Sequence, residues 1–452
     1  MNGNCLTIIL AAGEGTRMKS SLPKVLHPVA GLPMLLHILN IAKTAGSGQN
    51  AVVVGNQAER VGEVVTAHDE TTAIHVQSER LGTAHAVLAA RESLESGNFS
   101  DVVILNGDVP LIRSETIAAA RKVIADGADI CVLGFETSDP TGYGRMIMDG
   151  DALIAIREHK DASPEEKEIT FCNSGIFSFS AKCALEVIDQ IGNDNAQGEY
   201  YLPDAVEIGR SMGLNVTAVE VPEEETMGVN DRVQLSQVEA IWQTRRREQA
   251  MLDGVSMNAP DTVMFSHDTV VEKDATIEPN VVFGPKVTVC SGATIRAFSH
   301  LEGANVGQGS IIGPYARLRP GTEIGQNAKI GNFVETKKTN VGDGAKINHL
   351  SYIGDATVGS GANIGAGTVT CNYDGVNKHQ TRIGEGAFIG TNTSLVAPVS
   401  IGNGAMTGAG SVVTEDVGAD DLAIARNRQS NLPGKAAEVW ARNRAIKAQN
   451  SD

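Results

Sequence analysis

Residues 312–330 read IGPYARLRPGTEIGQNAKI, and every sixth position of this stretch carries an aliphatic side chain. The period is marked by Ile312, Leu318, Ile324 and Ile330. The same spacing runs from about Ile277 to Val413, with a slip of one residue at Val306, and glycine often follows the aliphatic residue. A short period kept in phase over such a length is typical of a solenoid, in which each repeat stacks on the next. The stretch therefore predicts a left-handed parallel β-helix of hexapeptide repeats, with glycine at its corners and about 18 residues to each three-hexad coil.

Polar segments interrupt the middle of this predicted β-helix, whereas a pure scaffold would continue its hexads unbroken. The segment 370–379, TCNYDGVNKH, leaves the six-residue period altogether. An off-phase insertion in a solenoid forms a loop that projects from the coils, and such loops often carry function. We therefore expect a functional site in this part of the β-helix.

Basic residues lie close in sequence to one histidine in the same region. The group consists of Arg319, Lys337, Lys338, Lys346 and His349. It suggests an anionic substrate and a proton acceptor, because the unperturbed pKa of histidine suits proton transfer near neutral pH. A lone histidine in a β-helix is more often structural, but the cations and the insertion favour His349 as a general base.

The N-terminal half alternates short apolar strands with amphipathic helices up to about residue 229. Strands are predicted at 6–10, 51–54, 74–77, 102–106 and 130–135, and helices at about 35–42, 82–94 and 114–125. This alternation predicts an α/β domain with a Rossmann-like, mostly parallel sheet that is covered on both faces and binds ligands at the carboxyl ends of its strands. Three parts are therefore expected: residues 1–232, a linker helix at 233–253, and the β-helix with its C-terminal tail at 254–452.

A glycine-rich segment, LAAGEGTRM at 10–18, follows the first predicted strand and is succeeded by LPK at 22–24. Small residues after a strand let backbone N–H groups approach phosphate oxygens, and Arg17 and Lys24 add positive charge for a triphosphate. The segment has neither the GxGxxG spacing of a dinucleotide site nor a Walker A loop. Asp108, at the end of another strand, could bind a hard cation, although a lone aspartate there is as often a turn or cap residue.

Charge and cysteine usage exclude several classes of protein. The 452 residues include 37 Lys plus Arg and 54 Asp plus Glu, a net charge of −17, which argues against non-specific binding to nucleic acid or membrane surfaces. The run Arg245–Arg247 is accordingly interpreted as a solvated helix face. Six cysteines without a CxxC pair suggest free thiols in a reducing cytoplasm, and no segment has the character of a signal peptide or membrane span.

Further motifs support a resemblance to known enzymes: QSERLGTAH at 77–85, NGDVP at 106–110, DPTGYGR at 139–145 and MGVND at 227–231. With the segment at 10–24 they resemble the signature of sugar-1-phosphate nucleotidyltransferases. The polar segments of the β-helix look like the acetyltransferase half of the bacterial bifunctional N-acetylglucosamine-1-phosphate uridyltransferase / glucosamine-1-phosphate N-acetyltransferase family. This resemblance covers nearly the whole chain. It implies an enzyme of UDP-GlcNAc biosynthesis that acetylates glucosamine-1-phosphate and then transfers UMP from UTP to GlcNAc-1-phosphate, releasing pyrophosphate.

The resemblance also implies the residues of the nucleotidyltransferase site. UTP and UDP-GlcNAc would contact Leu10, Ala11, Ala12, Gly13, Lys24, Gln77, Gly82, Thr83, Asn106, Gly107, Asp108, Gly142, Glu158, Asn173 and Asn230. Mg²⁺ would be held by Asp108 and Asn230, while Arg17 and Lys24 act as catalytic residues that stabilise charge on the transferring group. No nucleophilic side chain is required.

For the acetyltransferase site the resemblance implies two sets of contacts. Glucosamine-1-phosphate would bind Arg319, Lys337, Tyr352 and Asn363, and acetyl-CoA would bind Ala366, Asn372, Tyr373, Thr391, Ala409 and Arg426. His349 would remove a proton as the amine attacks the thioester directly. Cys371 is the alternative as a covalent acyl carrier, but nothing nearby in the sequence activates its thiol. The family associates as parallel homotrimers, so residues of adjacent chains would complete each acetyl site.

Two positions depart from the family pattern: Thr391 stands where serine is expected, and Asn106 where tyrosine can occur. Two other functions compete with the bifunctional one. A monofunctional nucleotidyltransferase with a scaffold β-helix, like ADP-glucose pyrophosphorylase, would lack the His349 cluster and the 370–379 insertion. A non-catalytic assembly subunit carrying both folds would have lost Arg17, Lys24 or Asp108. All of these features are present, so the bifunctional enzyme is the favoured hypothesis.

Overall fold

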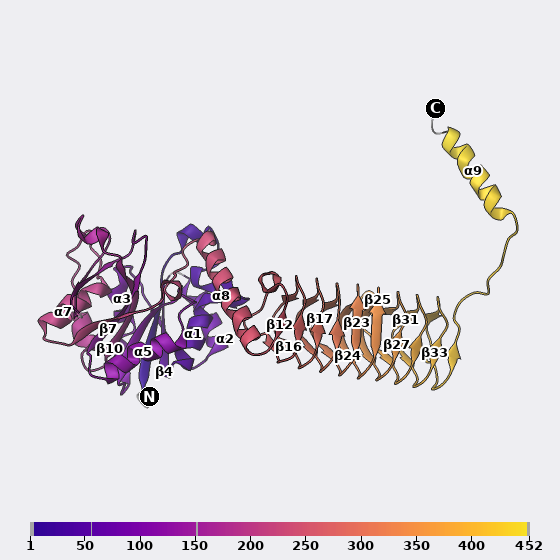
Figure 1. Cartoon of the computed structure of the whole chain (residues 1–452), viewed down its shortest axis with the longest axis horizontal. Coiled ribbons are helices and arrows are strands. Elements are labelled where there is room, and N and C mark those ends of the chain that lie inside the picture. Colours follow the sequence, from indigo (N-terminus) through magenta and orange to yellow (C-terminus); the bar gives the residue numbers. More distant parts are fainter. Residues whose placement is uncertain (1–3, 56, 151, 450–452) are drawn as a thin grey trace. The chain divides into compact units, whose positions relative to one another are not determined.

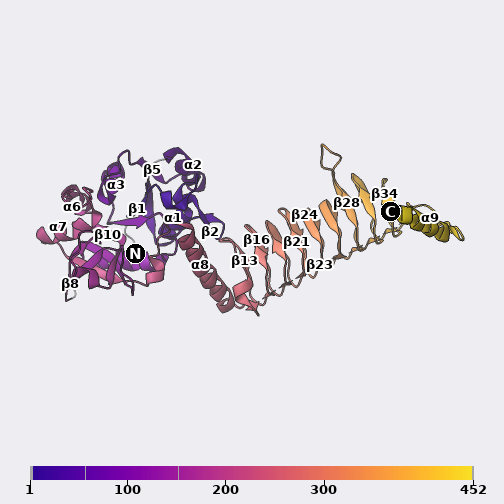
Figure 2. The same ribbon diagram turned by 90° about the horizontal axis from the view of Figure 1, so that it is seen from above.

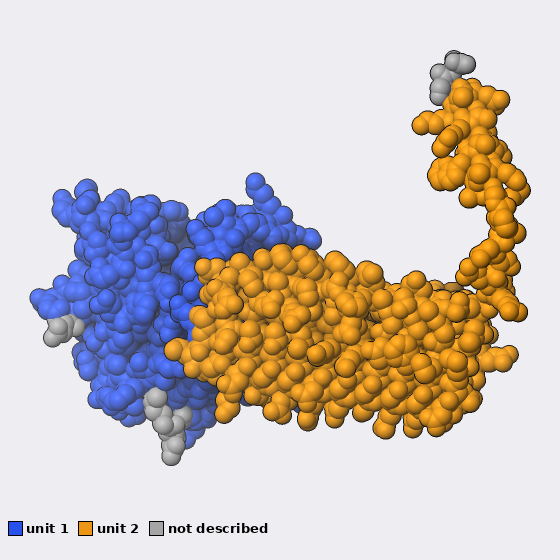
Figure 3. All heavy atoms as spheres, turned by 45° about the vertical axis from the view of Figure 1, so that its right-hand side comes forward, with its two compact units in different colours: residues 1–249, 265–267 blue, residues 250–264, 268–452 orange. Residues whose placement is uncertain are grey.

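The computed structural model describes residues 4–55, 57–150 and 152–449, and the chain forms two compact units (Figure 1, Figure 3). The first unit comprises Met1–Gln249 and Phe265–His267, and the second Ala250–Met264 and Asp268–Asp452. Helix α8 (Arg232–Leu252) carries the chain from the first unit into the second. It corresponds to the linker helix expected at 233–253.

A nine-stranded sheet lies at the centre of the first unit, in the order β5-β4-β1-β6-β10-β7-β11-β9-β8. Its strands are β1 (Cys5–Ala11), β4 (Ser47–Val54), β5 (Ala73–Val76), β6 (Asp101–Asn106), β7 (Ile130–Glu136), β8 (Arg145–Asp149), β9 (Ala152–Arg157), β10 (Phe171–Ser180) and β11 (Val216–Glu220). Strands β5, β4, β1 and β6 pair in parallel, whereas β10 runs antiparallel between β6 and β7. The α/β Rossmann-like fold is confirmed. The antiparallel strands β8, β9 and β10 fall outside the strands predicted from the sequence.

Helices cover both faces of this sheet, because each face carries its own apolar core. Helices α1 (Met34–Thr44), α2 (Ala58–His68) and α5 (Ser114–Ala125) bury side chains such as Leu35 in one core. Helices α3 (Thr83–Ala89), α6 (Ala184–Asp189) and α7 (Ala205–Ser211) bury side chains such as Val87 in the other. The prediction of one helix over 82–94 is wrong: Ala90, with φ −93° and ψ 19°, ends α3, and α4 (Arg91–Ser96) follows.

The first part of α8 packs on a hairpin formed by β2 (Pro28–Val29) and β3 (Leu32–Pro33). A buried cluster of Met18, Val29, Met34, Leu111, Val229 and Val238 holds the two together. The interpretation of Arg245–Arg247 as a solvated face is wrong. Arg245 donates to the Leu111 carbonyl at 2.6 Å, Arg246 lies 5.2 Å from the ring centre of Phe265, and Arg247 is only 8% exposed. The named contacts of Arg245 and Arg246 lie within the first unit.

The second unit is a left-handed parallel β-helix of short strands, from β12 (Ser256–Met257) to β35 (Leu422–Ala423), as Figure 2 shows. Most coils stack on the next with a spacing of 17 or 18 positions, as where Thr276 pairs with Thr294 and Lys329 with Lys346. The aliphatic residues of the six-residue period are buried, with Ile312, Leu318 and Ile330 each 0% exposed. The hexapeptide prediction is confirmed.

The predicted insertion projects from the coils, and Figure 2 shows it beside β28 (Val369–Cys371). Asn363 of one coil pairs with Phe388 of the next, 25 positions further on, so the extra residues leave the stacking intact. Within the loop Tyr373 and Lys378 form an antiparallel bridge, and the Lys378 ammonium lies 4.0 Å from the centre of the Tyr373 ring. The insertion is therefore an ordered loop with contacts of its own.

Helix α9 (Lys435–Gln449) ends the described part of the chain and buries none of its residues. Across the described residues, no helix combines the length and apolar character needed to cross a membrane. All six cysteines are free, as expected. Burial raises the pKa of the Cys5 and Cys131 thiols to about 12, so these two thiols are unreactive near neutral pH.

Candidate functional site

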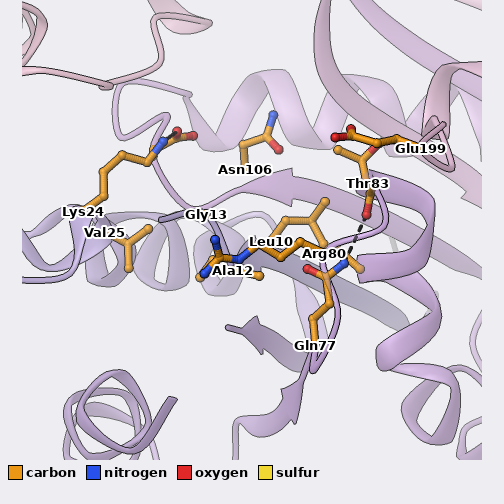
Figure 4. A pocket seen from close by; sticks show the side chains of 14 residues that line it. Leu10, Ala12, Gly13, Lys24, Val25, Gln77, Arg80, Thr83, Asn106 and Glu199 are labelled. Carbon is orange, nitrogen blue, oxygen red and sulfur yellow. Dashed lines mark hydrogen bonds and ion pairs between the residues drawn. The ribbon is translucent and has the colours of Figure 1, made fainter. Parts of the chain in front are cut away.

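A cavity of about 280 Å³ opens in the first unit where β1 and β6 end and α3 begins (Figure 4). Its lining comprises Leu10, Ala11, Ala12, Gly13, Lys24, Val25, Gln77, Arg80, Gly82, Thr83, Ala86, Asn106, Asp108 and Glu199. Ten of these are residues expected from the resemblance to contact the nucleotide. Segments that are far apart in the sequence thus meet at the carboxyl ends of parallel strands. This is where an α/β sheet binds its ligands.

Close backbone contacts set the shape of this cavity. The Gly107 N–H donates to the Leu10 carbonyl at 2.9 Å, which joins the ends of β6 and β1, and a Cβ at Gly107 would lie 3.1 Å from that oxygen. Gly82 has φ +114°, and a Cβ there would lie 2.4 Å from the Tyr200 carbonyl oxygen. Both glycines are needed because a side chain would separate the strands and loops that line the cavity.

Lys24, Asp108 and Asn230 meet at one edge of the cavity. The Lys24 ammonium forms an ion pair with the Asp108 carboxylate and donates to the Asn230 side-chain oxygen at 3.2 Å. A backbone hydrogen bond of 2.9 Å from Val229 N–H to the Asp108 carbonyl brings the two distant segments together. Because both oxygens reach the same cationic nitrogen, the pair is arranged to bind a positive charge.

This pair of oxygens also fits the Mg²⁺ that the sequence resemblance implies. Carboxylate and amide oxygens are hard ligands, and Mg²⁺ is commonly held by one or two of them together with water and substrate phosphates. Among the described residues no group of three or more His, Cys, Asp and Glu side chains could hold a metal ion. A magnesium ion here would therefore depend on the substrate for most of its ligands.

Three charged residues at this cavity differ from the sequence expectation. Arg17 is exposed on the 3₁₀ turn Thr16–Met18 and is not part of the cavity lining given by the described residues. Arg80 and Glu199 do line the cavity, although sequence reasoning gave neither a role. Arg80 could have been singled out as a cation in the segment after β5. Glu199 carries no such signal, because it reaches the site through the backbone contacts of Tyr200 with the loop before α3.

The residues expected to bind the sugar form a second group beside Asn106. Asn173 donates from its backbone N–H to the Gly144 carbonyl at 2.9 Å, and a Cβ at Gly144 would lie 3.1 Å from the Glu158 carboxylate. Asn106 donates from its side chain to the Gly175 carbonyl at 3.4 Å. Gly142 lies on the loop that leads into this group and has φ +87°.

Burial and nearby carboxylates perturb the acids of this group. The pKa of Glu158 is raised, first by burial and then by Asp161 and Asp204, while Arg145 opposes the shift. Burial, followed by the charge of Glu207, raises the pKa of Asp204 to about 6. Glu158 is therefore better suited to accept or share a hydrogen bond with a neutral sugar hydroxyl than to bind a cation.

In the second unit, one corner of the β-helix aligns residues of successive coils. Backbone N–H groups of Leu350, Gly367, Asn392 and Gly410 donate to the carbonyls of Asn332, His349, Ala366 and Thr391, at 2.7–3.2 Å. We call the resulting row Asn332, His349, Ala366, Thr391 and Ala409 the corner column. It places His349 next to Ala366 and in line with Thr391 and Ala409, three of the residues expected to bind acetyl-CoA.

Asn332 orients the His349 ring. The distance from His349 Nδ1 to the Asn332 side-chain oxygen is 2.7 Å. Since that oxygen can only accept, Nδ1 carries the proton and Nε2 carries the lone pair. His349 is exposed and is thus held in the tautomer that a general base at Nε2 requires. Sequence reasoning gave Asn332 no role; its 17-residue spacing from His349, one coil, is the signal that identifies it.

The residues expected to bind glucosamine-1-phosphate do not all meet within one chain. Arg319 and Lys337 lie on neighbouring coils next to Glu335, which pairs in register with Tyr352 and accepts from Arg319 at 2.8 Å. Asn363, on β27 (Asn363–Ile364), belongs to the separate ten-stranded sheet of the prism. The structure therefore brings three of the four together and places Asn363 on another face.

The projecting loop begins with a buried contact to this face. Asn372 is 5% exposed and donates from its side chain to Asp355 at 2.6 Å and to the Tyr352 hydroxyl at 3.4 Å. Tyr373 is 55% exposed, and Arg426 is exposed beyond β35. Asn372 thus supports Tyr352, while Tyr373 and Arg426 point out of the single chain.

Comparisons with known proteins agree with the division of the chain into an α/β unit and a β-helix unit. Residues 7–166 match the model of the MobA-like NTP transferase domain, and residues 303–338 and 380–415 match the bacterial transferase hexapeptide (six repeats). The chain is 58% identical to the "Bifunctional protein GlmU" of Sinorhizobium fredii over 448 residues, covering 99% of this chain and 98% of that protein. It is 54% identical to the protein of the same name from Agrobacterium fabrum, covering 99% of this chain and 98% of that protein. The protein of that name from Azorhizobium caulinodans is 56% identical, with coverage of 96% and 97%.

Proposed function

The chain belongs to the family of bifunctional GlmU proteins, and from this premise we propose how each of its two units carries out one reaction. It is a bifunctional enzyme of UDP-GlcNAc biosynthesis, a nucleotidyltransferase and an N-acetyltransferase in one chain. The β-helix unit acetylates glucosamine-1-phosphate. The α/β unit then transfers UMP from UTP to GlcNAc-1-phosphate and releases pyrophosphate.

For uridylyl transfer, the meeting of Lys24, Asp108 and Asn230 at the cavity carries the proposal. A phosphate oxygen of GlcNAc-1-phosphate attacks the α-phosphorus of UTP, the bond to the β-phosphate breaks, and pyrophosphate leaves. Magnesium bound by Asp108 and Asn230 would neutralise phosphate charge. Lys24 would then turn to the transferring phosphoryl group, and Arg17 would contact the phosphates from outside the cavity.

The remaining contacts of this unit follow from where each residue lies. The Ala11–Gly13 turn and Gly82–Thr83 would hold the nucleotide by their backbone, with Gln77 beside them at the base. Gly142, Glu158 and Asn173 would hold the sugar next to Asn106. The chemistry needs positioning and charge neutralisation rather than a nucleophile, which suits a site without a covalent intermediate.

For acetyl transfer, the Asn332-oriented His349 carries the proposal. Nε2 takes a proton from the glucosamine amine as its nitrogen attacks the thioester carbon of acetyl-CoA, and the carbon–sulfur bond breaks to release CoA. Arg319, Lys337 and Tyr352 would bind the sugar phosphate, and the corner column would run beside the acetyl-CoA chain. The Cys371 sulfur contacts only a carbonyl oxygen, that of Val369 at 4.0 Å, among the hydrogen bonds of the described residues, which supports direct attack.

We propose that this second site is completed in a homotrimer. Asn363 lies on a different face from Arg319, Lys337 and Tyr352, so a neighbouring chain is needed to bring the four around one ligand. Next to the corner column, Phe298, Tyr315 and Phe333 stack at ring-centre distances of 4.9 and 5.3 Å, and each is 48–55% exposed. An exposed apolar row of this kind is expected to be covered by another copy of the chain. Because both substrates and both donors are cytoplasmic metabolites, we also propose a cytoplasmic location.

A paired assay tests the two activities on the same preparation. One arm follows CoA release from acetyl-CoA and glucosamine-1-phosphate, and the other follows pyrophosphate release from UTP and GlcNAc-1-phosphate with Mg²⁺. Both products are expected from the unmodified chain. Pyrophosphate without CoA would favour the monofunctional enzyme with a scaffold β-helix, and neither product would favour the non-catalytic subunit.

A further inference from the structure

Two oppositely charged residues face each other at the mouth of the nucleotide cavity. Glu14 lies on the turn after β1, and Arg80 lies on the loop between β5 and α3; their side chains form an ion pair. Figure 4 shows the Arg80 side chain reaching from its loop toward the Ala12–Gly13 turn. The contact therefore joins the two segments between which the nucleotide must enter.

Arg80 is one of two cations among the described residues that line this cavity. Among the described residues that line it, Lys24 and Arg80 are positively charged, and Asp108 and Glu199 are negatively charged. The Lys24 ammonium is already held by Asp108 and Asn230. A nucleoside triphosphate brings several negative charges into the site. Among the residues lining the cavity, Arg80 is the cation available for the charges that Lys24 and a metal ion do not neutralise.

Glu14 engages the Arg80 guanidinium, a group that could also bind a phosphate. A guanidinium binds carboxylate and phosphate oxygens with the same planar fork of N–H donors. Glu14 also lines an adjoining hollow of about 220 Å³ that shares Gly13 and Lys24 with the first cavity, so the pair stands where the two hollows meet. Its side chains are 39% and 50% exposed, and an exposed pair of this kind contributes little to stability, so it can be exchanged readily.

We propose that Arg80 binds a phosphate oxygen of the incoming nucleoside triphosphate and that Glu14 competes for it in the empty site. This inference rests on the proposed uridylyl transfer and adds a binding residue and its internal competitor. Glu14 then weakens nucleotide binding, and Arg80 strengthens it. Removing Glu14 and removing Arg80 should therefore change the affinity for the nucleotide in opposite directions. In a purely structural ion pair, removal of either partner would have the same effect.

The test measures KM for UTP, KM for GlcNAc-1-phosphate and kcat in three variants. Arg80→Gln is expected to raise KM for UTP about tenfold, as for a lost charge-assisted hydrogen bond, with kcat and KM for the sugar phosphate unchanged. Glu14→Gln is expected to lower KM for UTP about threefold, since an exposed pair is weak. In the double variant KM for UTP should equal that of Arg80→Gln, because Glu14 acts only through Arg80.

Arg91→Gln is the matched control, since Arg91 is 41% exposed and ion-paired with Glu95 and Asp189 away from the cavity. It should change no kinetic constant, and CoA release by the β-helix unit should be unchanged in every variant. A KM for UTP within twofold of the unmodified chain in Arg80→Gln would overturn the inference, as would a higher KM in Glu14→Gln. Absence of pyrophosphate release from the unmodified chain would instead overturn the proposed function itself.

Discussion

The two units assemble their candidate sites in opposite ways. In the α/β unit, Lys24, Asp108 and Asn230 are separated by up to 206 positions, yet one nitrogen atom contacts both oxygens within a single chain. In the β-helix unit, His349 and its column neighbours lie on adjacent coils at a corner of the prism, and Asn363 lies on a different sheet from Lys337 and Tyr352.

The difference follows from the two architectures. A parallel sheet directs the ends of all its strands to one edge, so distant segments converge and enclose a cavity. A solenoid stacks each repeat only on its neighbours, so its functional residues form rows along the outside rather than converging on one point. The first architecture can complete a site within one chain, whereas in the trimer proposed above the second would receive its remaining residues from a neighbouring chain.

The largest effect is expected at the site that one chain completes. Asp108→Asn removes the negative charge that faces Lys24 and the proposed Mg²⁺, so uridylyl transfer should fall by about 10³-fold or more, as for the loss of a charge-stabilising group. Pyrophosphate release at saturating UTP and Mg²⁺ measures this, with CoA release as the control. If the rate of uridylyl transfer fell by less than tenfold, the group formed by Lys24, Asp108 and Asn230 would not be the reaction centre.

The next effect tests whether the second site is shared between chains. His349→Ala should lower CoA release by about 10²-fold, as expected for loss of a general base, and leave pyrophosphate release unchanged. Arg426→Ala should lower CoA release by raising KM for acetyl-CoA. If His349 and Arg426 of adjacent chains form one site, co-expression of the two variants should restore part of the CoA release. Mixed chains no more active than their parents would mean that each chain holds a complete site.

A smaller effect is expected from the residue that orients His349. Asn332→Ala should lower CoA release by about tenfold, because the imidazole loses the acceptor that fixes its tautomer. Asn332→Asp keeps an acceptor oxygen and should retain more activity, with its pH profile shifted to higher pH, since a carboxylate favours the charged imidazole. Equal losses and an unshifted profile in both variants would reduce Asn332 to a packing role.

Stability of the α/β unit should depend on Asp204. Its pKa in the folded chain, about 6, lies above the ordinary 3.8, so the folded state binds this proton more tightly and stability falls as pH rises from about 4 to about 6. Asp204→Asn should therefore stabilise this unit by about 1 kcal/mol at pH 8 and give no gain near pH 4. The change in stability is measured by comparing Asp204→Asn with the unmodified chain. At pH 8 the comparison uses the urea concentration that abolishes uridylyl transfer, and at pH 4 it uses the urea midpoint of the same unit. A gain equal at both pH values would contradict the cause given.

The smallest effect concerns the alternative acyl carrier. Cys371→Ser should leave CoA release within about twofold of the unmodified chain, because direct attack does not involve the thiol. Rapid-quench analysis for an acetylated chain would show none in either protein. Abolished activity, or an acetyl group on Cys371, would replace direct attack by a covalent intermediate.

Periodicity made the β-helix predictable in detail. The six-residue spacing identified the buried residues, and the off-phase segment 370–379 identified the loop, since both are local properties of the sequence. The strand ends bearing Gly13, Asp108 and Gln77 could likewise be found from apolar runs alone. Their convergence needs only the rule that parallel strands end at the same edge.

Contacts between distant segments could not be obtained from local pattern. Nothing around Asn230 indicates that it faces Asp108; only the resemblance suggested it. Arg247 looked like a solvated residue because the surroundings that bury it are assembled only in the folded unit. The Glu14–Arg80 pair has the same origin, since 66 positions separate residues whose loops meet only when β1 and β5 enter one sheet.

The corner column has a consequence for the length of the ligand it can serve. Coils repeat at about 4.8 Å, so the three steps from His349 through Ala366 and Thr391 to Ala409 amount to about 14 Å along the prism. The length of the column can therefore change only in steps of one whole coil. Removing one coil between His349 and Ala409 would delete either Ala366 or Thr391 and shorten the column by about 4.8 Å, so the remaining contacts would no longer match the length of an unchanged acetyl donor.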